Sequence, residues 1–502
     1  MNFKRMTVVV LVLFALSCNL VTRPFIQTTA TPPLLTASQP AATPAATLPP
    51  AATLPPAATR TRPASPSASV TAPPSASPAA GVTQVAKVAA PLYVPPACKG
   101  KPVATLPPAT TIAQPTPGVG TNAVLSQGDQ LSVFDALASK IHEVYLYPDF
   151  NGLDWNATVA KYRAQIQKGM DTEAFYQAMA QFVTDLGDEH SHFESPAEVT
   201  ASEAELAGTN DYVGIGVEVE PLPDKGRVTI LAIFPDSVAS HSGLKPHDSI
   251  LAVDGLPMAA NGQVYEYLVR GPECSAAVLT VQSPEGAPHP LTVIRDRVTA
   301  SLPIDAELVP TKDGTRIGYI FLPTFYDETI PDQVRTALRS FGKLDGLILD
   351  NRMNGGGSSD VVEPILSYFT SGTLGQFISR TASRSLRVNA DPVNNSQTVP
   401  LVVLVGQDTA SFGEIFAGIL QDGGRAKVVG QQTLGHVEAL SGYDFKDGSR
   451  VWVAQERFDP AHSHVNWEKR GITPDVVAFA DWDTFTLATD PGVAAALKLL
   501  EH

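Results

Sequence analysis

Two segments of this chain each combine a buried-looking strand, a tight turn and the start of a helix. In the first, the apolar strand Gly346–Asp350 runs into the glycine-rich stretch 351–357. In the second, the strand Val402–Val405 runs into a turn that contains Ser411 and continues to Glu414. Such turns present backbone amides and a serine hydroxyl at the rim of a sheet, where an acyl group can be attacked and its oxyanion held. Ser411 is therefore the candidate nucleophile, although a serine N-cap with a glutamate three residues later also fits a capping box.

The order of the other patterns predicts a multidomain α/β protein. Apolar residues recur at helical spacing from Leu131 to Val144, which predicts a helical segment in this part of the chain. Short strands and turns follow from 211 to 298, and strands alternate with helices from 302 to 502. That last alternation is typical of an α/β core.

The N-terminus has the composition of an export signal. Lys4 and Arg5 precede an apolar run, Met6–Leu16, that is too short to span a bilayer. The ending at Cys18 resembles a bacterial lipobox, which implies lipidation of Cys18 and residues 1–18 as a lipoprotein signal peptide. We therefore expect an extracytoplasmic, membrane-anchored lipoprotein at the cell surface or in the periplasm; cleavage without lipidation is the alternative.

Residues 19–125 are rich in Ala, Pro, Thr and Ser and are predicted to form a disordered linker. Residues 1–120 contain no Asp or Glu but eight of the 35 basic residues, so residues 121–502 hold 27 basic residues against all 50 acidic ones. Such an acidic body argues against nucleic acid as a partner. Beyond Cys18, the chain has two cysteines, Cys98 and Cys274, whose positions look unrelated; whether they pair stays open.

Residues 209–299 resemble a PDZ domain. The resemblance rests on the loop Tyr212–Val217 and on the later stretch Gly243–Gly255. It implies that the segment containing Val213, Gly214, Ile215 and Gly216 binds the C-terminal tail of a peptide through backbone amides. The alternative is a packing module without a ligand.

Five ordered motifs extend the resemblance to roughly residues 130–500. "GYIFLPTF", "LDNRMNGGG", "TASFGEIFAG", "QDGGRAKVVG" and "GITPDV" resemble the C-terminal processing peptidases of the S41 serine-protease family, with tricorn-like features. The resemblance implies a helical N-terminal peptidase segment at 126–208 and a crotonase/ClpP-like catalytic core at 300–502. It also implies Ser411 as nucleophile, with the amides of Gly356 and Phe412 as the oxyanion hole.

The base departs from the processing-peptidase pattern, because His436 stands where that branch has its lysine. His436 itself is one candidate, since imidazole titrates near neutrality. The tricorn-like branch suggests another, with His190 as base and Glu468 as supporting carboxylate. The third alternative is that the protein has lost its catalytic activity. Triad partners meet in space and not along the chain, so spacing leaves all three open.

The predicted function is therefore a serine endopeptidase that cleaves polypeptides through an acyl-enzyme, without metal or organic cofactor. The alternative is an inactive peptide-binding lipoprotein that keeps the scaffold. His462 and His464 lack a nearby cluster of metal ligands in the sequence, and they are expected to lie in a solvated loop. The substrate and the oligomeric state do not follow from the sequence.

Overall fold

The computed structural model describes residues 92–105, 122–188, 190–206, 212–260, 263–299, 302–311 and 314–501. The predicted signal peptide with Cys18, and most of the predicted linker, lie outside these residues. Within the described part of the chain, no helix combines the length and the hydropathy needed to cross a bilayer.

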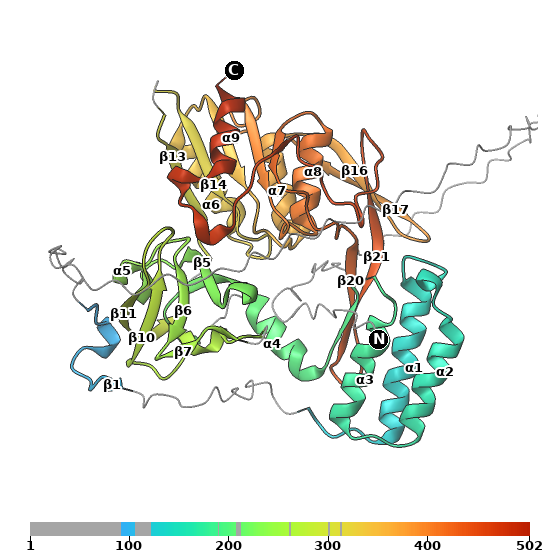
Figure 1. The fold of residues 1–502 in the computed structure, drawn as a ribbon. Helices are drawn as coiled ribbons and strands as arrows, with labels where there is room; N and C mark the ends of the chain where they lie inside the picture. The colour runs from blue at the N-terminus through green and yellow to red at the C-terminus, as the bar shows by residue number, and fades with distance from the viewer. Residues whose placement is uncertain are drawn as a thin grey trace, which may run out of the picture. The chain divides into compact units, whose positions relative to one another are not determined.

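The C-terminal part is built on a six-stranded sheet (Figure 1). Five of its strands pair in parallel, and only β13 at one edge pairs antiparallel. In spatial order the strands are β13 (Asp305–Val309), β14 (Ile317–Phe321), β15 (Gly346–Asp350), β18 (Leu401–Val405), β19 (Lys427–Gly430) and β22 (Val476–Val477).

Helices cover both faces of this sheet, because successive strand residues point to opposite sides. Leu347 and Leu349 of β15 belong to one apolar cluster, and Ile348 between them belongs to another. Burial on both faces explains why these strands are continuous apolar runs. The first cluster includes residues of α6 (Ile330–Phe341), α7 (Ser359–Phe369) and α8 (Phe412–Asp422), and the second includes residues of α9 (Pro491–Leu500).

The predicted helical segment has its own aromatic core and one strand that joins a distant partner. Phe134, Trp155 and Phe182 pack together in this core. The strand β2 (His192–Glu194) pairs antiparallel with β21 (Arg450–Pro460). The helices are α1 (Gln127–Val144), α2 (Trp155–Gln167), α3 (Thr172–Thr184) and α4 (Pro196–Leu206), and β16 (Gly372–Ile378), β17 (Ser383–Val388) and β20 (Ala439–Asp444) complete the sheet around β21.

The segment between residues 212 and 298 is a β-rich domain with a separate apolar core. Its main sheet has the order β1-β10-β6-β5-β4, so β4 is an end strand, while β3 pairs with β12. A short helix, α5 (Val238–Ser242), follows β5. The strands are β3 (Tyr212–Gly214), β4 (Val217–Leu222), β5 (Arg227–Ile233), β6 (Ser249–Val253), β7 (Leu256–Pro257), β8 (Ala259–Ala260), β9 (Gln263–Val264), β10 (Ser275–Gln282), β11 (His289–Ile294) and β12 (Asp296–Val298).

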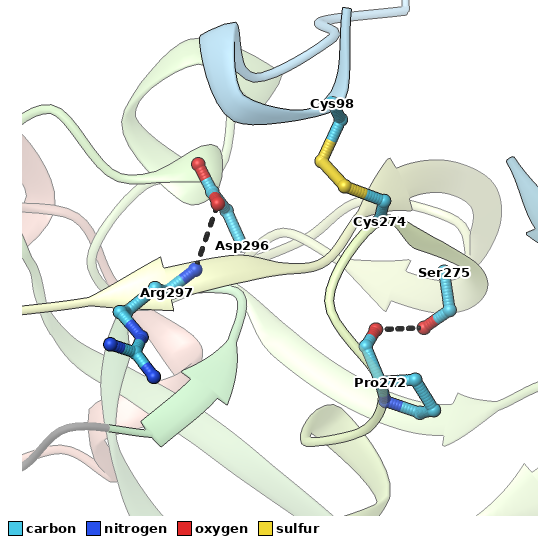
Figure 2. The surroundings of a disulfide bond; sticks show 6 residues. All are labelled: Cys98, Pro272, Cys274, Ser275, Asp296 and Arg297. Carbon is cyan, nitrogen blue, oxygen red and sulfur yellow. Dashed lines mark hydrogen bonds between the residues drawn. A yellow bond between two sulfur atoms is a disulfide. The ribbon is translucent and has the colours of Figure 1, made fainter. Parts of the chain in front are cut away.

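A piece of the predicted linker is part of this domain. Cys98 and Cys274 form a disulfide with a Cα–Cα distance of 5.4 Å, and both are buried (Figure 2). The strand β1 (Ala104–Thr105) adds in parallel to β10. The view of the two cysteine positions as unrelated is therefore wrong, and so is the extension of the disordered linker over residues 92–105. Sequence separation does not report distance in space.

We predict that the disulfide stabilises this domain against unfolding. Pairing two cysteines that lie 176 residues apart removes many conformations from the unfolded chain. The double variant Cys98→Ser/Cys274→Ser is expected to lose about 2–5 kcal/mol of unfolding free energy in urea titrations. Reductant should lower the wild-type value by a similar amount and leave the double variant unchanged. Two labelled thiols at these positions in the unreduced, unfolded wild-type protein would contradict the pairing.

Candidate active site

Ser411 occupies a strained position at the start of α8. Its backbone dihedrals are φ 51° and ψ −125°, a region that side chains other than glycine rarely adopt. It is the N-cap residue, but its side chain makes no capping hydrogen bond. The carboxylate of Glu414 instead accepts hydrogen bonds from Thr433 and from the amides of Gly435 and His436. The capping-box alternative is therefore wrong.

The glycine-rich turn after β15 packs directly against the serine turn. A Cβ atom on Gly356 would lie 2.6 Å from Cβ of Ser411, and Gly356 has φ +106°. A Cβ on Gly413 would lie 2.4 Å from the carbonyl oxygen of Asn354. Any larger side chain would push the two turns apart. The two segments singled out in the sequence thus meet in space, as predicted.

The predicted oxyanion donors lie beside the serine. The Phe412 amide opens α8, where backbone N–H groups have no partner inside the helix. The Gly356 amide donates to Oδ1 of Asn354 at 2.9 Å. An oxyanion has to replace Asn354 as the acceptor before this second amide can serve.

His190 lies in the turn between α3 and β2. The carboxylate of Asp188 accepts hydrogen bonds from the His190 amide at 3.0 Å, the Ser191 amide at 2.8 Å and the Ser191 hydroxyl at 2.6 Å. Oγ of Ser191 in turn accepts from the Ala454 amide of β21 at 3.0 Å. These contacts and the β2–β21 pairing fix the backbone of His190 against the catalytic core.

Glu468 bridges His190 to the loop that precedes β20. Its Oε1 lies 3.1 Å from Nε2 of His190, and the side chains are 4% and 8% exposed, respectively. Its Oε2 accepts from the Val437 amide at 3.0 Å. The next residue, Lys469, donates its amide to the Gly435 carbonyl at 2.7 Å. The predicted pairing of His190 with Glu468 is thus present in the structure.

His436, the other candidate base, lies at the same place. Its ring centroid is 4.3 Å from that of His190, with the planes nearly perpendicular. Its carbonyl oxygen accepts a hydrogen bond from the Ser411 amide at 2.7 Å. The structure therefore brings both imidazoles together and links the backbone of one to the nucleophile. The two histidines that the sequence offered as the base, His190 and His436, therefore lie in one site and not in two separate sites.

Burial and neighbouring carboxylates act in opposite directions on His190. Burial by itself lowers the pKa of the imidazole, but the hydrogen bond and charge of Glu468 and the charges of Glu438 and Asp188 outweigh it. The net effect is a pKa raised above the ordinary 6.5. A carboxylate that stabilises the imidazolium is what a histidine base requires of its partner.

Two buried glutamates of this site were not predicted in their roles: the sequence suggested only a capping role for Glu414 and none for Glu438. Burial raises the pKa of Glu414 and of Glu438 to about 7. Glu414 holds the loop around His436, and Tyr147 donates its hydroxyl to Oε1 of Glu438. The one available signal was the position of Glu438, two residues after the histidine in the lysine position.

The four predicted peptide-binding residues lie far from these groups in the sequence, at the start of the β-rich domain. Val213 and Gly214 are in β3 and pair with β12. The Ile215 carbonyl accepts from the Ala239 amide at 2.8 Å, and the Gly216 carbonyl accepts from the Phe234 amide at 3.1 Å. Gly216 has φ +80°, and a Cβ there would lie 2.2 Å from Cβ of Ser237.

Comparisons with known proteins identify the family of this chain. The model of peptidase family S41 matches residues 316–478, and that of the tricorn protease C1 domain matches residues 129–184. A carboxyl-terminal-processing protease of Synechocystis sp. is 29% identical over 370 residues, which cover 72% of this chain and 84% of that protein. The chloroplastic C-terminal processing peptidase of Tetradesmus obliquus is 30% identical over 358 residues, which cover 67% of this chain and 74% of that protein. The chain belongs to peptidase family S41.

This membership confirms the predicted family and the predicted enzyme class, a serine-type peptidase. The fold is also similar to that of an S41 protease from Bacteroides fragilis, with a TM-score of 0.52 and 17% identity over 73% of this chain and 97% of that one. The mixed α/β character predicted for the core is confirmed by the strand and helix order and by this likeness.

We predict that Glu468 sets the pKa of His190. In Glu468→Gln the hydrogen-bonding charge is lost while burial remains, so the pKa should fall. An NMR titration of the His190 ring measures this shift, with His464→Ala, at an exposed position, as the control variant. An unchanged His190 pKa in Glu468→Gln would contradict the arrangement.

Proposed function

We propose that this S41 peptidase cleaves polypeptides with Ser411 as nucleophile, His190 as general base and Glu468 as the carboxylate that orients the base. The observation that carries the proposal is the buried His190–Glu468 pair, 3.1 Å apart. Its imidazole stacks edge-on against His436, whose carbonyl holds the Ser411 amide. A serine, an imidazole and a carboxylate from three separate segments are the parts that acyl transfer needs.

The proposed reaction has two halves. Oγ of Ser411 attacks the scissile carbonyl carbon while its proton passes to the imidazole, and the oxyanion accepts hydrogen bonds from the Gly356 and Phe412 amides. The imidazolium then gives that proton to the leaving amine, and the peptide C–N bond breaks. Water then gives a proton to the same imidazole and attacks the acyl carbon, the bond between that carbon and Oγ breaks, and the imidazolium returns the proton to Ser411 as the acid leaves. With Nε2 facing Glu468, Nδ1 of His190 is the nitrogen left for the proton.

His436 replaces the lysine of the processing-peptidase branch in this proposal. An imidazole in that position keeps the site free of a fixed positive charge beside His190. Its ring also packs against the base and limits its rotation. The alternative is that His436 is the base and that His190 and Glu468 orient it. Substitution of each histidine, and not the fold, distinguishes the two assignments.

The substrate class is inferred from the relatives and from the β-rich domain. The relatives from Synechocystis and Tetradesmus are named as C-terminal processing enzymes. We infer that residues 209–299 act as a PDZ domain that binds substrate tails. The strand β4 ends its sheet, which leaves an edge where a peptide can add a strand. Because the Ile215 carbonyl accepts from the Ala239 amide, the Gly216 amide of the same planar peptide group points the opposite way and can donate to the carboxylate of a substrate tail.

The cellular location in this proposal rests on the sequence alone. The basic start, the short apolar run and Cys18 suggest export and lipid anchoring, and the proline-rich stretch suggests a spacer between membrane and enzyme. These residues lie outside those the structure describes.

We predict that a fluorophosphonate labels the wild-type protein and fails to label Ser411→Ala. Hydrolysis of a model polypeptide should fall by about 10⁶-fold in Ser411→Ala and in His190→Ala, because each removes one member of the triad. His436→Ala should cost less, since in this proposal the serine proton passes to His190 and not to His436.

The outcomes separate the alternatives. A larger loss in His436→Ala than in His190→Ala, in protein with an unchanged circular dichroism spectrum, would move the base to His436. Absence of labelling in folded wild-type protein would replace the peptidase with a peptide-binding protein on an inactive scaffold.

We also predict that the β-rich domain recognises a free C-terminus. A fluorescent peptide with an apolar C-terminal residue should bind Ser411→Ala, which cannot cleave it, and the C-terminally amidated peptide should bind at least about tenfold more weakly. Fluorescence anisotropy measures both affinities. Equal affinities for the two peptides would contradict the assignment of a site that binds the C-terminal tail.

A further inference from the structure

One oxygen of Glu438 has no role in the proposed reaction and no partner. The Glu438 side chain is 3% exposed, and its Oε1 accepts the Tyr147 hydroxyl. Its Oε2 is buried without a hydrogen-bond donor among the residues that the structure describes. Burial of a carboxylate oxygen without a donor is costly, so a group that would satisfy it is expected.

The neighbours of Glu438 are metal-ligating groups. One ligand atom from each of His190, Glu438 and Glu468 can be chosen so that all three lie within 4.8 Å of one another. Among the ion pairs of the described residues, neither Glu438 nor Glu468 pairs with a lysine or an arginine. Two carboxyl groups and one imidazole therefore share a small buried space. A divalent cation would replace the protons that these groups hold and would occupy the free oxygen.

We propose that His190, Glu438 and Glu468 form a zinc site that overlaps the catalytic base. Zinc accepts imidazole nitrogen and carboxylate oxygen together, at about 2.0–2.2 Å, with water in the fourth position. Tetrahedral ligands at that distance are about 3.4 Å apart. Nε2 of His190 and Oε1 of Glu468 are 3.1 Å apart, and one ligand atom from each of the three residues lies within 4.8 Å of the others, so the three side chains need only a small movement to reach zinc distances. Magnesium and calcium fit less well, because they prefer oxygen ligands alone.

Zinc in this position blocks the peptidase. The ion takes the place of the proton between Nε2 of His190 and Glu468, and it draws electron density from the ring. Nδ1 then becomes a poor acceptor for the serine proton, and Glu468 no longer orients the base. This inhibitory consequence rests on the proposed function, whereas zinc binding itself does not.

Equilibrium dialysis of the chelator-treated, intact protein against Zn²⁺ alone tests the site. One Zn²⁺ per chain is expected, and Glu438→Gln should weaken binding at least tenfold because it removes one ligand without changing the size of the side chain. Ser411→Ala should bind zinc like the wild type. His464→Ala is the control for adventitious surface binding, since His464 lies beside Asp459 and is 65% exposed. Co²⁺ should give the visible absorption of a tetrahedral site.

Each outcome bears on one part of the proposal. Zinc affinity that is unchanged in Glu438→Gln and His190→Ala, or lost in His464→Ala, overturns the site. In active enzyme, zinc should reduce hydrolysis, a chelator should restore it, and Glu438→Gln should require at least tenfold more zinc. Binding without inhibition of active enzyme overturns the inhibitory role alone. Binding to a protein that fluorophosphonate does not label leaves the zinc site standing and removes the proposed function.

Discussion

The carboxylate of Glu468 connects the separate chain segments that form the candidate active site. One of its carboxylate oxygens contacts His190, which belongs to the helical segment. The other accepts a hydrogen bond from the amide of Val437, the residue after His436. A buried charge-assisted hydrogen bond contributes about 1.5–3 kcal/mol, and removing one partner of a buried pair costs more than the bond itself contributes. The catalytic geometry therefore depends on one side chain that belongs to neither the serine turn nor the glycine-rich turn.

A second constraint is the close approach of those two turns. Gly356 has no room for a side chain beside Ser411, and Ser411 itself is held in a strained conformation. The surrounding structure keeps that strain in place: Glu414 anchors the following loop, and the His436 carbonyl holds the Ser411 amide. Strain of this kind persists only where neighbours over-determine it, which is typical of a nucleophile presented to substrate.

Local patterns in the sequence predicted the regular elements well. The strand Gly346–Asp350 has the predicted bounds, and strands alternate with helices beyond residue 302 as predicted. Such runs are set by apolar periodicity, which is a property of neighbouring residues. The disulfide and β1 were missed because they join a proline-rich segment to a strand 176 residues away, and composition says nothing of such a contact.

The sequence by itself determined the family, the candidate nucleophile and the absence of the usual lysine, because each depends on residue identity within a short motif. It also supplied both candidate histidines and Glu468. Only the tertiary structure decided that His190 meets Glu468, that His436 lies against the same ring, and that Glu438 is buried beside them. These contacts join residues from 190 to 468. They depend on the pairing of β2 with β21, which no local pattern encodes.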